Sequence, residues 1–464
     1  MKKIKVGFLP LYIKLYDDSI GPHIRVPMEK YMNMAINMLE SQGIDVVLAD
    51  VCRIKPEFEA ATAMFNEADV DAVITMHLAY SSSLESIEAL MKLNAPIIVF
   101  DSTPDYDLIK SAGYANRITP NHGIHGVQDM CNLLKRNGKP YYICAGHALH
   151  SEVIAELAGM CRAAAVKKAY ETMKIGSVGG SFTGMGDFLI SDERYKSDIG
   201  AEVSYMTPDV VNEYLAKVTD EEIDAEMALE KEKYNVQVTY LEEHRLATKS
   251  GLAIRKWMEE KGLGSVTVNF LTLDICCLPK MPFPECCKVL ERGLGYAGEG
   301  DVLTAGLVGA MHSVYPNTTF TEMFCPDWEQ DVILLSHMGE SNPSLAQWKP
   351  VIRDRNFSYN SCGNTVAMYT CCRPGNAAIV NLAPMNDGFN MILCPGKLLD
   401  VGLERGAYAA ATQGWFKPGK PLPQFLKAYS LAGGTHHSAM VYDVNVEELK
   451  VFGEMMGFNV FVID

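Results

Sequence analysis

The sequence predicts an α/β protein built from two doubly wound (Rossmann-like) α/β domains followed by a β-rich, barrel-like C-terminal domain. Three observations support this fold class. Short β-branched runs alternate with helical patterns in the first third, a similar series begins after an alanine-rich helix, and the final third has short strand patterns separated by turns. A chain of 464 residues is also too long for one ordinary hydrophobic core, so several domains are expected.

The first third contains five short apolar runs that we interpret as strands, at residues 4–9, 44–48, 70–74, 96–100 and 141–144. Between them lie segments with the 3.6-residue apolar spacing of helices, at residues 28–41, 56–68, 84–92 and 124–136. This alternation predicts a parallel sheet covered by helices on both faces. Ligands of such sheets bind beyond the carboxyl ends of the strands, which draws attention to His77 and Asp101.

The alanine-rich segment 151–173 is predicted to be a helix that connects the first α/β unit to a second. The second unit comprises a predicted strand and glycine turn, a charged helical region, a further strand and a further helix, at residues 174–180, 220–261, 265–270 and 284–292. We therefore place an N-terminal α/β domain at 1–174, a central α/β domain at 175–318 and a β-rich C-terminal domain at 319–464.

The last third changes to strand patterns at residues 331–335, 365–369, 378–382 and 390–393. Turn signals at 373–376 and 386–388 separate them, which favours an antiparallel sheet or barrel. A helix at 446–456 and a strand at 459–463 close the chain.

The composition excludes some classes of protein. A net charge of -16 argues against a nucleic-acid partner, because phosphate binding draws on clustered Lys and Arg. No apolar run approaches the roughly 20 residues that cross a bilayer, so no membrane association is expected. The chain starts directly with a strand pattern and has 13 cysteines, an odd number, which predicts a cytoplasmic protein with reduced thiols.

Glu299 is the first candidate for chemistry, because residues 295–301 (GYAGEGD) predict a small-residue loop from which its carboxylate can point into a cleft. Glu322, His337 and His437 lie on three other segments flanked by Gly, Ser or Thr. Two carboxylates and two imidazoles suit a hard or borderline divalent metal. Each residue also has a structural interpretation, a helix-capping or loop carboxylate for the glutamates and a packed histidine for the others, and spacing alone leaves both open.

Residues 293–298 (GLGYAG) spell the Gly-x-Gly-x-x-Gly dinucleotide fingerprint. That fingerprint must follow a strand, whereas this one follows a predicted helix, which argues against a nicotinamide or flavin site.

Four motifs resemble the metal-site motifs of the L-arabinose isomerases, within the L-fucose/L-arabinose isomerase superfamily: residues 296–301 (YAGEGD), 320–322 (FTE), 336–338 (SHM) and 431–438 (LAGGTHHS). The strand at 379–384 (IVNLAP) is loosely similar to a family strand and is expected to carry no site residue. In the first third the match consists of Leu15-Tyr16, Met76-His77 and His125-Gly126.

The resemblance implies Mn²⁺, or another divalent metal, held by Glu299, Glu322, His337 and His437. It also implies a homo-oligomer, commonly a hexamer, in which the N-terminal domain of a neighbouring subunit closes each active site. The substrate-binding residues it indicates are His77, His436 and Tyr16.

The function that follows is a metal-dependent aldose-ketose isomerase, an intramolecular oxidoreductase that moves a proton between C1 and C2 through a cis-enediol. Glu299 and Glu322 are the predicted catalytic residues, alternating as base and acid. The substrate is predicted to be an L-arabinose-like or L-fucose-like aldose. Residues 10–14 and 182–187 depart from the family pattern, so isomerisation of a C6-modified hexose, such as sulfoquinovose to sulfofructose, is an alternative. A non-catalytic sugar-binding protein is the alternative of another class.

Overall fold

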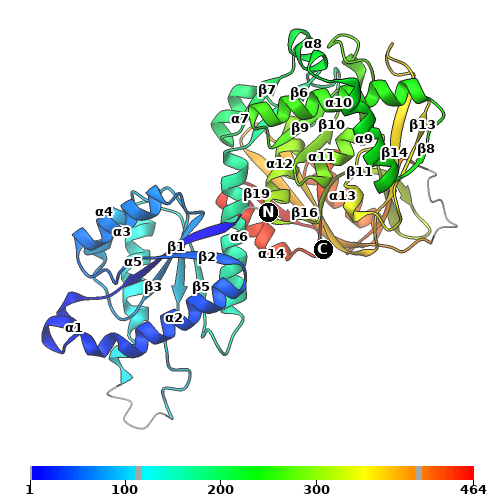
Figure 1. Cartoon of the computed structure of the whole chain (residues 1–464). Coiled ribbons are helices and arrows are strands. Elements are labelled where there is room, and N and C mark those ends of the chain that lie inside the picture. The colour runs from blue at the N-terminus through cyan, green and yellow to red at the C-terminus, as the bar shows by residue number, and fades with distance from the viewer. Residues whose placement is uncertain (1–2, 111–116, 403–409) are drawn as a thin grey trace. The chain divides into compact units, whose positions relative to one another are not determined.

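The computed structural model describes residues 3–110, 117–402 and 410–464 (Figure 1). The chain divides into two compact units, one ending at Lys168 and one running from Ala169 to Asp464. Within the described ranges, no helix is both long and apolar enough to span a bilayer. All 13 cysteines are free thiols, as the sequence predicts.

The first unit is a five-stranded parallel sheet in the order β2-β1-β3-β4-β5. Its strands are β1 (Ile4–Leu11), β2 (Ile44–Leu48), β3 (Ala72–His77), β4 (Ile97–Asp101) and β5 (Tyr141–Ala145). The helices are α1 (Lys14–Ser19), α2 (Val26–Ser41), α3 (Lys55–Glu67), α4 (Ser83–Leu90), α5 (Gly123–Arg136) and α6 (Val153–Glu171). Apolar residues of α3, α4 and α5, such as Phe58, Leu90 and Met130, form one core with the buried side chains of the sheet. The predicted doubly wound sheet is confirmed.

The second unit begins with another parallel sheet, in the order β10-β9-β6-β7. Its strands are β6 (Lys174–Val178), β7 (Glu202–Tyr205), β9 (Ser265–Val268) and β10 (Gly295–Gly298). The helices around it are α7 (Asp192–Asp198), α8 (Pro208–Ala216), α9 (Asp220–Lys233), α10 (Leu241–Lys261), α11 (Phe283–Glu291) and α12 (Val302–Val314). The predicted charged helical region is therefore two helices, α9 and α10, separated by the short strand β8 (Asn235–Gln237).

The predicted loop at residues 295–298 is wrong, because this segment is the fully buried strand β10. Its small residues serve close packing and not flexibility. A Cβ on Gly295 would collide with the Ser265 hydroxyl and with the backbone of α12 at Ala305.

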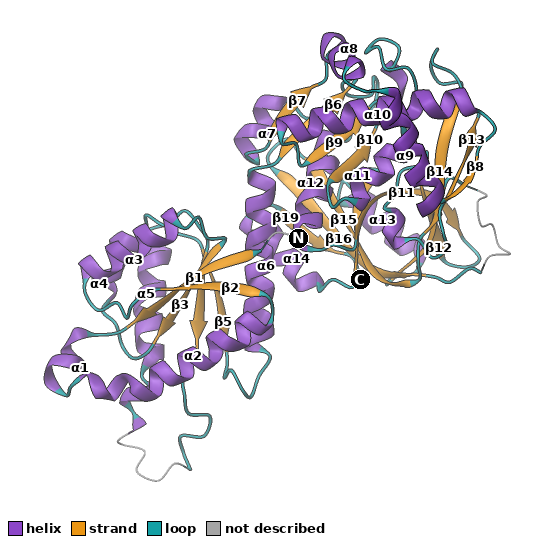
Figure 2. Cartoon of the chain, in the orientation of Figure 1, coloured by secondary structure: helices purple, strands orange, loops and turns teal. Residues whose placement is uncertain are grey.

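The last part of the chain is an antiparallel barrel of six strands in the closed order β16-β15-β18-β11-β12-β17, since β17 also pairs with β16. These strands are β11 (Thr318–Asp327), β12 (Val332–Ser336), β15 (Gly375–Pro384), β16 (Phe389–Leu398), β17 (Thr412–Pro418) and β18 (His437–Tyr442). Strands β11, β12, β15 and β16 are labelled in Figure 2. Four strands extend the sheet: β8, β13 (Val351–Arg355), β14 (Thr365–Cys371) and β19 (Asn459–Val462). The remaining helices are α13 (Leu422–Leu431) and α14 (Val446–Met455). Closure of this barrel confirms the predicted fold class, while the domain boundaries at 174/175 and 318/319 stay predictions.

Candidate metal centre

Glu299 is placed by the end of strand β10. Its backbone N–H donates to Val268 O over 3.0 Å, and its carbonyl accepts from the N–H of Phe182 at 2.9 Å. The residue adopts φ 65°, a left-handed conformation that costs free energy for a residue with a side chain. The next residue, Gly300, has φ 78°, and a Cβ there would collide with Gly180 O. This turn fixes the backbone of Glu299, so its buried carboxylate has a defined direction.

The other three predicted ligands lie on neighbouring barrel strands. Glu322 on β11 is directly opposite His437 on β18 and opposite Ser336 on β12. His337 follows Ser336 at the end of β12. The pairing of β18, β11 and β12 therefore brings Glu322, His337 and His437 to one level of the barrel, although up to 115 positions separate them in sequence.

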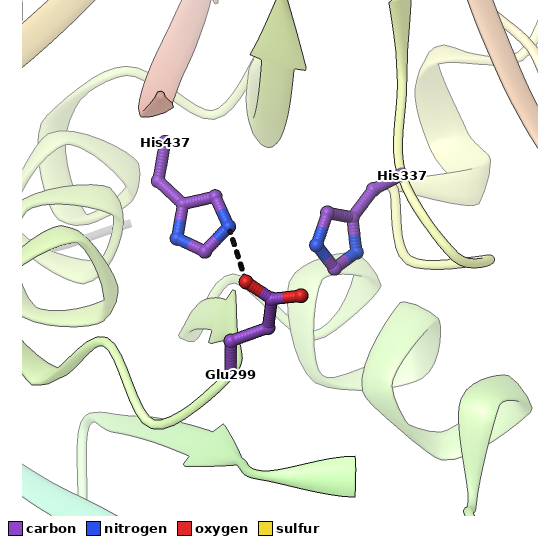
Figure 3. Close-up of side chains that lie close together, drawn as sticks. All are labelled: Glu299, His337 and His437. Atoms are coloured by element: carbon purple, nitrogen blue, oxygen red, sulfur yellow. Dashed lines mark ion pairs between the residues drawn. The ribbon is translucent and has the colours of Figure 1, made fainter. Parts of the chain in front are cut away.

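Glu299, His337 and His437 point toward one another, and one ligand atom from each lies within 4.8 Å of the others (Figure 3). The Glu299 Oε2 atom is 3.6 Å from His437 Nε2, and Glu322 Oε2 is 4.0 Å from His337 Nε2. The fold thus gathers all four predicted metal ligands into one cluster. Imidazole nitrogens and carboxylate oxygens in this arrangement suit a divalent metal such as Mn²⁺ or Zn²⁺.

His437 and His337 each donate a hydrogen bond to a buried carboxylate on the side of the ring away from the cluster. Nδ1 of His437 donates to Asp301 Oδ2 at 3.0 Å, and Nδ1 of His337 donates to Glu340 Oε2 at 2.7 Å. Because a carboxylate only accepts, each Nδ1 must carry the proton, and Nε2 is the atom that faces the cluster. Nε2 of His437 is buried and has no hydrogen-bond partner in the described part of the chain. This carboxylate-histidine arrangement orients metal-ligating imidazoles in proteins, so the residues present fit a bound metal.

The two glutamates have pKa values displaced in opposite directions. Burial raises the pKa of Glu322, and the charges of His337 and His437 only partly oppose it. Burial also acts to raise the pKa of Glu299, but the proximity of His436 and the charges of the other imidazoles outweigh it and the pKa falls below its usual value. The environment therefore differentiates the two carboxylates, as is common where one group accepts a proton and another supplies it.

His436 lies beside the cluster and is paired with Asp187. Its Nδ1 is 2.6 Å from Asp187 Oδ2, and its Nε2 is 3.6 Å from Glu299 Oε2. Burial alone would lower the pKa of His436, but Asp187 and Glu299 raise it to about 10. Burial would likewise raise the pKa of Asp187, yet its hydrogen bonds with His436 lower it to about 2. His436 is therefore a cationic neighbour of Glu299.

Comparison with known proteins connects this cluster to one family. The L-arabinose isomerase central domain matches residues 194–317, and the L-arabinose isomerase C-terminal domain matches residues 317–459. Together these two domains of one family cover more than half of the chain, including all four clustered residues.

The chain belongs to the L-arabinose isomerase family.

Its relatives confirm that the similarity extends over the whole length. The L-arabinose isomerase of Aeromonas salmonicida is 24% identical and aligns with 100% of this chain and 95% of its own length. That of Thermotoga petrophila is 24% identical over 94% of this chain and 90% of its own length. Among solved structures, a solute-binding protein from Agrobacterium vitis bound with alpha-D-tagatopyranose is 13% identical over 67% of this chain and 89% of its own, with a TM-score of only 0.17. This member of the L-arabinose isomerase family is thus an enzyme of the aldose-ketose isomerase class.

Two of the predicted substrate-binding residues of this isomerase belong to the other unit. His77 ends β3 and is 3% exposed, and both of its ring nitrogens lack a hydrogen-bond partner in the described structure. Burial lowers its pKa to about 3, so this imidazole is neutral. The hydroxyl of Tyr16 on α1 lies 3.5 Å from His122 Nδ1. Roles for His77 and Tyr16 in substrate binding stay predictions.

Sequence reasoning missed the residues that hold the isomerase's histidines. Asp301 and Glu340 lie two and three residues after the predicted ligands Glu299 and His337. The presence of an acidic residue so close to each predicted ligand was the signal that could have found them. Asn381 sits on β15, a strand expected to carry no site residue. It is fully buried, and its amide nitrogen donates to Thr435 Oγ1 at 2.6 Å and to His437 O at 2.7 Å. It thereby fixes the backbone of the turn that carries both histidines.

Proposed function

We propose that this protein is a Mn²⁺-dependent isomerase that interconverts an aldose and its ketose by proton transfer between C1 and C2 through a cis-enediol. The observation that carries the proposal is the convergence of Glu299, His337 and His437 on one point, with both imidazole Nε2 atoms turned inward by buried carboxylates. Other divalent metals with the same ligand preference are open to this site.

Four side chains would hold the metal: Glu299, Glu322, His337 and His437. The bound cation would supply a Lewis acid that polarises the sugar carbonyl and stabilises negative charge on the enediol oxygens. Because both ring Nδ1 atoms donate to carboxylates, the imidazoles keep one orientation and present Nε2 without rearrangement.

Glu299 and Glu322 are the proposed base and acid of the proton transfer. They approach the same space from two sheets, Glu299 from the end of β10 and Glu322 from β11. One carboxylate removes the proton from the carbon that carries the hydroxyl, and the other protonates the neighbouring carbon or oxygen. The lowered pKa of Glu299 and the raised pKa of Glu322 suit one group that accepts a proton and one that supplies it.

Proposals for the assembly follow from family membership. We propose a cytoplasmic homohexamer in which the N-terminal domain of a neighbouring subunit, with Tyr16 and His77, completes each active site. The division into domains 1–174, 175–318 and 319–464 belongs to the same proposal.

The proposed substrate is an L-arabinose-like or L-fucose-like aldose. Isomerisation of a C6-modified hexose such as sulfoquinovose is retained as an alternative, because residues 182–187, next to His436, depart from the family pattern. A non-catalytic sugar-binding role is the less favoured alternative, since the two relatives described above, which align over 94% or more of this chain, are L-arabinose isomerases by name.

The deciding experiment treats the purified protein with a chelator, restores Mn²⁺ and follows ketose formation from a panel of aldoses. Turnover that depends on Mn²⁺ is expected for at least one aldose. Both Glu299→Gln and Glu322→Gln should abolish turnover with the fold intact, while the exposed Glu329→Gln should not change it. Wild-type turnover in either of the first two variants, or turnover in the absence of any metal, contradicts the proposal.

A further inference from the structure

The side chain of Asp187 makes two contacts with one histidine. Its Oδ2 atom accepts the backbone N–H of His436 at 3.0 Å and the Nδ1–H of the same residue at 2.6 Å. The first contact fixes the main chain of His436 and the second fixes its ring. Asp187 lies in the segment between β6 and α7, 249 positions away in sequence, so the sequence offers no sign of this pairing.

The contact leaves the other ring nitrogen of His436 facing the metal centre. Nε2 is buried without a hydrogen-bond partner in the described structure, and it lies 3.6 Å from Glu299 Oε2, too far for a good hydrogen bond. A buried nitrogen left unsatisfied beside a carboxylate of the site calls for an explanation. An oxygen of a sugar that enters between His436 and Glu299 would provide the missing partner.

Of the two adjacent histidines, His436 is the one open to the surroundings. Its side chain is 29% exposed, whereas that of His437 is 0% exposed. The neighbour of Asp187, Phe188, stacks on the ring of His437 with centroids 5.4 Å apart and an interplanar angle of 11°. Phe188 thus packs against both rings, stacked on His437 and tilted by 45° against His436, whereas the hydrogen bonds of Asp187 hold His436.

We propose that Asp187 is a positioning residue that aims Nε2 of His436 at the sugar beside Glu299. The inference rests on the proposed function, because it assigns His436 to the substrate and not to the metal. Asn381 holds the backbone of the same turn through Thr435 and His437. Loss of Asp187 should therefore release the ring of His436 while the turn itself keeps its path.

The kinetic test compares wild type with Asp187→Asn, which keeps the size of the side chain but removes its charge, so that the Nδ1–H faces at best a neutral amide oxygen, a weaker acceptor than a carboxylate. We expect kcat/KM to fall by about 10- to 100-fold, as for other partners that orient a functional imidazole. Mn²⁺ affinity should change by less than about threefold, since His436 is not a ligand. The matched control is Glu193→Gln, an exposed acidic residue of α7, which should behave as wild type.

A double-mutant cycle separates positioning from a general structural effect. If Asp187 acts through His436, Asp187→Asn should reduce kcat/KM by less than about twofold in a His436→Gln background. An equal fold-loss in both backgrounds overturns the proposal, as does wild-type kcat/KM in Asp187→Asn alone. Thermal unfolding checks that each variant folds, and Asp187→Ser replaces Asp187→Asn in the cycle if that variant does not.

A spectroscopic test does not depend on turnover. In protein with ¹⁵N-labelled histidine, the Nδ1–H of His436 bonded to a carboxylate should give a low-field proton resonance that moves to higher field or disappears in Asp187→Asn and is absent in His436→Gln. A resonance absent from wild type, or unchanged in Asp187→Asn, overturns the proposal. If wild type converts no aldose, the proposed function fails, while this resonance still decides whether Asp187 holds His436.

Discussion

His437 and Asp301 share one hydrogen bond at the candidate metal centre. Nδ1 of His437 donates to Oδ2 of Asp301 at 3.0 Å, while Oδ1 of the same carboxylate accepts the backbone N–H of Thr304 at 2.8 Å and so caps helix α12. Both Asp301 and His437 are fully buried. The start of α12 and the orientation of a proposed metal ligand therefore depend on the same side chain.

Replacing Asp301 by Ser should separate these two roles. Serine is a good N-cap residue, so the helix start is retained, but it cannot replace the carboxylate behind His437. We expect Mn²⁺ affinity, measured by titration calorimetry, to fall by about 10- to 100-fold. Asp301→Ala should lose the same affinity and a further ~1 kcal/mol in the free energy of unfolding, measured in urea. Unchanged Mn²⁺ affinity in both variants would show that Asp301 only caps the helix.

Metal removal should lower the stability of the protein. A ligand that binds only the folded state stabilises it by about 2.7 kcal/mol at a concentration 100 times its Kd. Adding Mn²⁺ to chelator-treated protein is therefore expected to raise the Tm in a concentration-dependent way. His337→Gln should remove most of this rise, whereas His150→Gln, in the other unit, should retain it. A Tm indifferent to Mn²⁺ would argue against a metal site.

Asn381→Ala should destabilise the protein and impair the site together. The change leaves the buried backbone N–H of Thr435 without its acceptor, while the carbonyls of Thr435 and His437 keep the hydroxyls of Tyr429 and Thr435 as donors. An unsatisfied buried donor costs about 1–3 kcal/mol, and we expect a loss in that range in urea unfolding with a lower kcat. Asn390→Ala, which removes one partly buried bond to Ala432 O, is the matched control and should keep kcat.

Gly298→Ala should displace His337. A Cβ at this position would lie 2.5 Å from Cε1 of the His337 ring, well inside contact distance, so the imidazole must move. The expected result is a fall of about tenfold or more in Mn²⁺ affinity, by calorimetry. Gly186→Ala serves for comparison, because an added Cβ there meets nothing within 4 Å. Equal Mn²⁺ affinities for the two variants would remove His337 from the ligand set.

Glu226 should make stability depend on acid pH. Burial acts to raise its pKa, but hydrogen bonds from Arg255 and the charge of Lys288 lower it from 4.5 to about 2. A lowered pKa stabilises the fold above pH 4.5, and this contribution is lost as the pH falls through about 2. Wild type should therefore lose about 2 kcal/mol more than Glu226→Gln between pH 6 and pH 3. Urea unfolding at the two pH values measures the difference, and parallel losses would contradict it.

Local sequence patterns were enough for much of the fold. The apolar runs at 44–48 and 96–100 form strands β2 and β4 because β-branched residues suit a pleated, buried surface, and the helices between them follow from 3.6-residue spacing. The same reasoning failed at residues 295–298. The glycines of this segment indicate a turn when only the local sequence is considered, yet the segment is a buried strand. Its residues are small because Ser265 and α12 leave no room for larger side chains.

By itself, the sequence determined the fold class and the four residues of the candidate site, because Glu299, Glu322, His337 and His437 stand in motifs that can be recognised one segment at a time. Only the tertiary structure decided how they meet and what orients them. The register of β11 against β18 sets Glu322 opposite His437, and Asp187 reaches His436 across 249 positions. Such contacts depend on strand pairing and packing between distant segments, which no local pattern encodes.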